Sequence, residues 1–310
     1  MVRRRESVCV RRRESICVRR SASSVLLSGL KNLTYALIIL IILYPMYYML
    51  IVTLSEGLAV MKNEVWLYPK GFSLNVYAKV MRDSRIMKAY VNTILYVSVG
   101  TAISLMSTVC AAYALSKNDR LVCHRFFSFF ILIPMFFGGG MIPTYLVVKG
   151  LGLLNSIWAV TLPGAVSCWN LIITRSFFIN FPHEIEEAGV IDGLFDYGLL
   201  FRVVIPLSKP VLATIGLFYG VGLWNNFFGP FLYLDNQNKF PLQIILRQIV
   251  MQGVDTEALN SNAALNRDGL VVGEALKYAT IIVSMVPVLI VYPFIQKYYE
   301  KGIMIGSIKG

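Results

Sequence analysis

The sequence predicts an all-α membrane protein with six transmembrane helices. Of its 310 residues, 56% are hydrophobic and 15% are charged, whereas soluble domains have about 45–50% and about 25%. The mean hydropathy is +0.64, and the apolar residues are concentrated in long uncharged windows. A soluble core cannot enclose this much apolar surface, so the composition favours a multi-pass membrane protein.

Six windows are long enough to cross a hydrocarbon layer of about 30 Å at a rise of about 1.5 Å per residue. They span residues 32–55, 89–116, 126–148, 150–174, 211–234 and 278–296, and none contains Asp, Glu, Lys or Arg. If the N-terminus is cytoplasmic, 18 of the 29 lysines and arginines lie on the cytoplasmic side, as the positive-inside rule requires. We therefore expect both termini in the cytoplasm, although the external loop 56–88 is itself basic.

The first 20 residues contain a direct duplication. Residues 2–9 are repeated at 10–17 with one change, Val8 to Ile16, and a further Val-Arg-Arg follows. Such a tract has too little apolar surface to fold alone. We expect residues 1–24 to form a disordered basic cytoplasmic arm that touches anionic lipid, and residues 25–310 to form the six-span domain. The net charge of +12 follows from membrane topology, so nucleic acid is not the expected partner.

The six windows lack the groups that intramembrane enzymes and proton-coupled transporters place at membrane depth. Both histidines, His124 and His183, fall in predicted loops, and the sequence has neither an HExxH helix nor a CxxC pair. The sequence therefore predicts no catalytic residue, no metal site and no proton relay. Energy for any transport would come from another subunit.

Uncharged polar groups do occur inside two windows. Trp169 and Asn170 lie in the fourth, and Trp224, Asn225 and Asn226 lie in the fifth. Two interpretations remain open: the amides bond neighbouring helices, or rings and amides line a path for a sugar. Successive helical positions differ by about 100°, so at most two of the three consecutive residues can face one cavity. We expect Trp224 and one of the amides to do so.

The loop at residues 180–210 carries the most specific pattern. Pro182 is followed by Glu184, Glu186 and Glu187, a helix-start signal because carboxylates there meet the positive end of the helix dipole. Gly193 permits a sharp turn, and Pro206 and Pro210 are expected to end a second helix at the membrane. The prediction is two short helices joined at a glycine.

At this loop the sequence resembles the membrane subunits of binding-protein-dependent ABC importers, whose signature is Glu-Ala-Ala, a later Gly and Ile-x-Leu-Pro. The matching positions are Glu187, Ala188, Gly189 in place of the second alanine, Asp192, Gly193, Ile205 and Pro206, with Ile205 standing directly before the proline. Segments 141–145, 150–155, 224–230 and 302–310 extend the resemblance to the carbohydrate branch, near the smaller maltose-transporter permease and permeases for complex oligosaccharides.

The resemblance implies the type I permease fold and an oligosaccharide importer in the bacterial cytoplasmic membrane. It implies a second homologous permease, two ATPase subunits that bind ATP and Mg, and an extracytoplasmic sugar-binding protein. Glu187 would contact the ATPase, Ala188 and Gly189 would permit close approach, and Gly193 would set the bend. The chain has no phosphate-binding loop of its own and is expected to bind no cofactor. A non-transporting receptor or scaffold is the alternative, and the identity of the sugar stays open.

Overall fold

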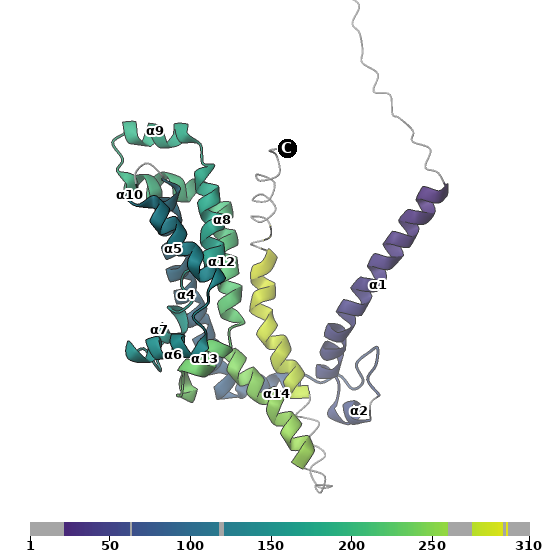
Figure 1. Cartoon of the computed structure of the whole chain (residues 1–310). Coiled ribbons are helices and arrows are strands. Elements are labelled where there is room, and N and C mark those ends of the chain that lie inside the picture. Colours follow the sequence, from purple (N-terminus) through teal and green to yellow (C-terminus); the bar gives the residue numbers. More distant parts are fainter. Residues whose placement is uncertain (1–21, 63, 118–120, 260–274, 294–295, 297–310) are drawn as a thin grey trace, which may run out of the picture. The chain divides into compact units, whose positions relative to one another are not determined.

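The computed structural model describes residues 22–62, 64–117, 121–259, 275–293 and 296, which form helices and loops and no strand (Figure 1). The chain divides into two compact units, Met1–Tyr48 and Met49–Gly310, and each is considered by itself. The predicted arm lies outside the described residues except for its last three, which begin the first helix.

The helices follow one another along the chain as follows: α1 (Ala22–Thr53), α2 (Gly57–Met61), α3 (Asn75–Arg82), α4 (Ser84–Ser116), α5 (His124–Phe136), α6 (Met141–Gly150), α7 (Ile157–Thr161), α8 (Cys168–Ile179), α9 (His183–Ile191), α10 (Asp196–Leu199), η1 (Leu200–Val204), α11 (Ile205–Leu207), α12 (Lys209–Trp224), α13 (Phe228–Tyr233), η2 (Gln237–Lys239) and α14 (Leu242–Leu259). A C-terminal helix covers Ala275–Pro293. Most of α1 lies in the first unit. Its apolar side chains between Leu30 and Leu43 are exposed, as befits a helix that faces lipid.

Length and composition identify three helices that could each cross a membrane, Gly29–Thr53, Ser84–Ser116 and Ala275–Pro293. Two bent helix pairs also qualify. The chain bends by 119° between His124–Phe136 and Met141–Gly150, and by 86° between Asp196–Leu207 and Lys209–Trp224. By this test the described residues supply up to five spans, so the predicted count of six is not confirmed.

The fourth window, residues 150–174, is the one that corresponds to neither a long helix nor a bent pair. It divides into the five residues of α7 and the first part of α8, with a turn at Pro163 and Gly164 between them. α8 then continues beyond the window to Ile179 and has 12 residues, or about 18 Å of helix. A window chosen for the absence of charge cannot locate this break, because the residues that make the turn are uncharged.

α4 is the helix around which the second unit packs. α8 and α12 lie along it, and α3, α5, α7 and α14 also contact it. One core cluster, near α9, joins Val109, Ala112, Tyr113, Phe178, Phe181, Leu199, Leu200, Val204 and Leu212. A second cluster, near α14, joins Val80, Ile86, Ala89, Trp224, Leu242, Ile245 and Ala279.

Small and hydroxyl side chains make the contacts between α4 and its neighbours close. A Cβ atom at Gly100 would lie 2.7 Å from Leu223 Cδ1 of α12 and 3.1 Å from Thr161 Cγ2 of α7. The Thr108 and Tyr219 hydroxyls are hydrogen bonded at 2.7 Å, and the backbone N–H of Ser167 donates to the same tyrosine oxygen at 2.9 Å. Lipid supplies little hydrophobic drive for helix association, so close packing and such polar contacts hold the bundle together.

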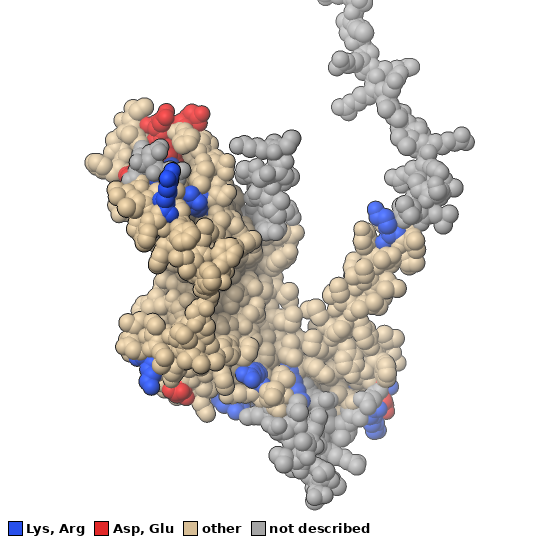
Figure 2. All heavy atoms as spheres, viewed as in Figure 1, with Lys and Arg blue, Asp and Glu red and all other residues tan. Residues whose placement is uncertain are grey.

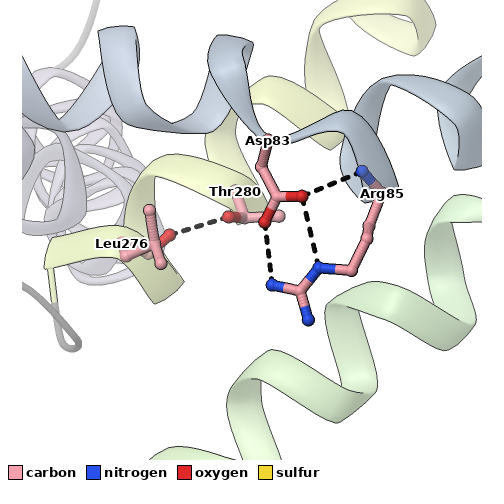
Figure 3. Close-up of polar contacts among 4 residues, drawn as sticks. All are labelled: Asp83, Arg85, Leu276 and Thr280. Carbon is pink, nitrogen blue, oxygen red and sulfur yellow. Dashed lines mark hydrogen bonds and ion pairs between the residues drawn. The ribbon is translucent and has the colours of Figure 1, made fainter.

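Asp83 caps the start of α4. Its carboxylate accepts the backbone N–H of Arg85 at 2.9 Å and pairs with the Arg85 guanidinium at 3.3 and 2.9 Å (Figure 3). The side-chain bond from Arg85 is the main reason that the pKa of Asp83 is lowered. Thr280 of the C-terminal helix lies near this cap and donates to the carbonyl of Leu276 at 2.8 Å (Figure 3). The cap therefore fixes the α3–α4 turn where the second core cluster begins.

Gly100→Ala should destabilise the bundle, because Leu223 and Thr161 must shift to admit the methyl group. Overpacking of this kind costs about 1–3 kcal/mol. Gly216→Ala is the matched control, since its Cβ would meet only Leu105 Cδ2 at an ordinary 3.8 Å. The thermal midpoint of the detergent-solubilised protein should fall for Gly100→Ala and stay constant or rise for Gly216→Ala. Equal midpoints for the two variants would contradict the close contact.

Candidate functional site

The two ends of α9 lie where the sequence places them. Pro182 is the N-cap, with Glu184 and Glu186 in the first turn. At the other end Gly193 has a φ of +80°, and its N–H donates to the carbonyl of Val190 at 3.0 Å. The N–H of Leu194 donates to the carbonyl of Gly189, also at 3.0 Å. This pair of bonds is the Schellman arrangement, which favours glycine at the left-handed position, so the predicted bend at Gly193 is confirmed.

Gly189 lets α9 approach the segment that follows it. It is buried, and a Cβ atom there would lie 2.6 Å from Leu199 Cδ1. Leu199 is itself buried in the first core cluster with Phe178 and Phe181, which lie just before α9. The glycine that replaces the alanine of the signature therefore permits contact within this chain.

An ion pair joins α9 to the end of α4. The Lys117 ammonium contacts both carboxylate oxygens of Glu186, and the two side chains are 16% and 12% exposed. The same ammonium lies 5.2 Å from the centre of the Tyr113 ring. In the sequence alone, Glu186 is recognisable only as part of a helix-start signal. The available clue to its partner was Lys117, the first charge after a long uncharged window.

A second polar contact ties α8 to the same end of α4. Arg175 donates through Nε to the carbonyl oxygen of Leu115 at 2.9 Å. One ring nitrogen of His124, at the start of α5, lies 3.1 Å from that oxygen and 3.4 Å from an Arg175 terminal nitrogen. The C-terminal carbonyls of a helix lack intrahelical partners, and these side chains satisfy one of them. Polar contacts therefore join α4, α5 and α8 at the end of the unit where α9 lies.

The outer face of this region is apolar and acidic. Ile191, Phe195 and Tyr197 are 85%, 87% and 80% exposed. Glu184, Glu187, Ala188 and Asp192 are also exposed. Figure 2 shows acidic side chains gathered over the α9 end of the second unit. We call Glu187, Val190, Ile191, Asp192, Phe195 and Tyr197 the outer face of α9 and its turn. Large apolar side chains exposed to this degree mark a surface that contacts another protein or a membrane.

The second helix of the loop ends one residue after Pro206, close to the predicted end, and departs from prediction at Pro210. α10, η1 and α11 form one segment, Asp196–Leu207, which continues through Ile205 and Pro206. The chain then bends at Ser208, and Pro210 lies in the first turn of α12. Proline lacks the N–H that a first helical turn leaves unused. Pro210 therefore begins a helix where we had expected it to end one.

The predicted path residues are placed in different environments. Trp224 is buried, donates from Nε1 to the carbonyl of Ser284 at 3.2 Å, and packs edge-on against Tyr90. Asn225 is exposed, while Asn226 lies just before α13 and its side-chain oxygen accepts the N–H of Gly229 at 3.2 Å. Trp169 is 61% exposed and Asn170 is buried. The helix-bonding interpretation fits Trp224 within this chain, and the role of these residues toward a sugar stays a prediction.

Among the residues that the structure describes, no three His, Cys, Asp or Glu side chains are grouped as a metal site would require. The described part of the chain thus presents an apolar and acidic surface at one end and a set of broken helices at the other.

Residues 86–305 match the family described as "Binding-protein-dependent transport system inner membrane component". The chain belongs to this family. It is therefore a transporter permease and not an enzyme, a multi-pass inner membrane protein that works with an ATPase and a substrate-binding protein. The alternative of a non-transporting receptor or scaffold is not favoured.

Relatives and a solved structure agree with the family. The chain is 40% identical to the polygalacturonan/rhamnogalacturonan transport system permease protein YtcP of Bacillus subtilis, over 87% of this chain and 94% of that one. It is 26% identical to the arabinooligosaccharides transport system permease protein AraQ of Halalkalibacterium halodurans, over 93% and 99%. A chain of a bacterial ABC transporter involved in import of the acidic polysaccharide alginate superimposes with a TM-score of 0.81 at 33% identity, covering 90% of this chain and 99% of that one.

Glu186→Gln should loosen this permease's α9 from α4, because it leaves the partly buried Lys117 ammonium without a carboxylate. Loss of such a pair costs on the order of 2 kcal/mol, and here the cost falls on the seating of one short helix. Limited proteolysis within α9 should accelerate, while Glu187→Gln, which removes an exposed carboxylate one residue away, should leave it unchanged. The exchanged pair Lys117→Glu with Glu186→Lys should restore most of the protection. Protection that is unchanged in Glu186→Gln would show that the pair does not hold α9.

Proposed function

We propose that this permease forms half of the translocation path of an ATP-driven carbohydrate importer, with a second homologous permease as the other half. Relatives named for the transport of polygalacturonan/rhamnogalacturonan and of arabinooligosaccharides, together with the alginate importer, support a saccharide substrate. ATP and Mg bind to two ATPase subunits, and an extracytoplasmic binding protein delivers the sugar. The observation that carries the proposal is the outer face of α9 and its turn, an exposed surface on a helix anchored to the core of the bundle.

In this proposal the outer face of α9 and its turn docks on the ATPase. Its exposed rings and aliphatic side chains supply the apolar contact, and Glu187 and Asp192 supply charge that selects the orientation of docking. Displacement of α9 by the ATPase is passed to α4 through the Lys117–Glu186 pair and through Leu199 under Gly189. The coupling element therefore needs both an exposed outer face and a buried inner one, and α9 has both.

The proposed orientation places α9, the start of α5 and both termini in the cytoplasm. His124 contacts the carbonyl of Leu115, two residues before Lys117, so Cys123 lies at the α9 end of the unit. Lys149 lies in the last turn of α6, at the other end of the same unit (Figure 1). This assignment puts the predicted cytoplasmic lysines and arginines of the second and third inner loops at one end.

Gly193→Val should uncouple the importer. A β-branched residue at positive φ costs about 1–3 kcal/mol and would displace the turn between α9 and α10. Gly152→Val is the matched control, because Gly152 also has a positive φ, of +67°, and open space around its Cβ position, but lies at the other end. Substrate-stimulated ATP hydrolysis by the reconstituted importer should fall severalfold for Gly193→Val only. Glu187→Lys should also lower this rate of ATP hydrolysis, because it weakens association with the ATPase. Similar losses in the two glycine variants would contradict a specific coupling role.

Cys123 should react with an impermeant thiol reagent only from the cytoplasmic side. The measurement uses a variant in which Cys123 is the single cysteine, with labelling compared between intact cells and inside-out vesicles. A second variant, in which Lys149→Cys supplies the single cysteine, should give the reverse result. Labelling of Cys123 in intact cells would overturn the proposed orientation.

A further inference from the structure

Arg247 of α14 is a cation that the proposed coupling mechanism does not use and that two aromatic rings support. Its guanidinium carbon lies 5.1 Å from the centre of the Phe227 ring and 5.2 Å from the centre of the Phe231 ring. The arginine side chain is exposed. Among the side chains that the structure describes, the ion pairs at this end are Lys70 with Glu64 and Arg85 with Asp83, and neither includes Arg247. Its charge is therefore open to a ligand.

The two rings place Arg247 at the break between α12 and α13. Phe227 directly follows Asn225 and Asn226, and Phe231 lies one turn into α13. The rings are 38% and 58% exposed, and the neighbouring Phe228 is 49% exposed. Aromatic faces pack against the C–H faces of sugars. Arg247 thus brings a positive charge to a part of the chain whose rings and exposed amide already suit a saccharide.

The position of Arg247 is fixed by its own helix. On the other side of α14, Leu242 and Ile245 are buried in the second core cluster. The N–H of Leu242 donates to the Thr93 hydroxyl of α4 at 2.8 Å. Asn92 of α4 donates to the carbonyls of Asn238 and Phe240, at 2.8 and 3.2 Å, just before α14. A charged group held in place before its ligand arrives loses little entropy on binding.

We propose that Arg247, supported by Phe227 and Phe231, binds the carboxylate of an acidic, uronate-bearing saccharide as it enters the path. A guanidinium that rests on aromatic faces keeps its N–H donors at its edge, where they fit both oxygens of a carboxylate. The proposal rests on the proposed function and adds its substrate class. It also gives a reason for the basic external end, where Lys88, Lys149, Lys239 and Lys277 accompany Arg247 and would raise the local concentration of a polyanion.

The test uses the full importer with its binding protein in proteoliposomes. Uptake is measured for tetragalacturonate and tetramannuronate, and for the neutral tetramers of glucose and xylose. We expect an acidic tetramer to be imported. Arg247→Gln should lower its kcat/KM about tenfold, or about 1.4 kcal/mol, and Arg247→Lys should lower it less. Lys149→Gln removes a charge at the same end without an aromatic support, so it tests long-range attraction alone and should lower uptake far less than Arg247→Gln does. Gel filtration of each assembled complex and basal ATP hydrolysis serve as controls.

The outcomes separate the acidic substrate class, the role of Arg247 and the saccharide function. If only neutral tetramers are imported, the acidic substrate class is wrong and the importer function stands. If an acidic tetramer is imported equally well by wild type and Arg247→Gln, the assignment of Arg247 is wrong. If Arg247→Gln does not assemble, Phe231→Leu replaces it, since loss of one supporting ring should also lower uptake of the acidic tetramer. If no tetramer of either kind is imported, the saccharide function fails and this inference fails with it.

Discussion

The packing of α8 and α12 along α4 is the constraint on which the rest of the second unit depends. Gly100 brings α12 and α7 close to α4, and Tyr219 links α12 to both α4 and the start of α8 through its hydroxyl. Between helices in lipid, contact of this kind replaces the hydrophobic effect as the main source of stability. Both candidate functional regions are attached to this contact, one at each end of α4.

At the α9 end, polar anchors and apolar burial serve different purposes. Leu199 fills the space under Gly189 and holds the turn against the core. The Lys117–Glu186 pair and the bond from Arg175 to Leu115 fix the end of α4 to its neighbours. A helix attached in both ways moves with the bundle. The side chains left over, Ile191, Phe195 and Tyr197, are free to contact another protein.

At the other end, the break between α12 and α13 brings two aromatic rings to Arg247. The chain leaves α12 at Trp224 and starts α13 at Phe228, so that Asn225 is exposed and the Phe227 and Phe231 rings reach Arg247. An unbroken helix would turn these residues toward several neighbours. Broken helices are tolerated in membrane proteins where protein or a water-filled cavity covers the freed backbone, and such places are where membrane proteins bind polar ligands.

The sequence by itself determined the helical membrane class, the family, and the two ends of α9, where Pro182 precedes the helix and Gly193 follows it. These features follow from composition and from residues that act on their own backbone, since a glutamate-rich first turn and a positive-φ glycine work locally. Only the tertiary structure decided that Glu186 pairs with Lys117 while Glu187 is exposed, and that Trp224 is buried against Tyr90. It also decided the break in the fourth window, the role of Pro210 as a helix start, and the meeting of Arg247 with two phenylalanine rings. Each of these depends on which residues from distant parts of the chain come together, and no local pattern of hydrophobicity or charge contains that information.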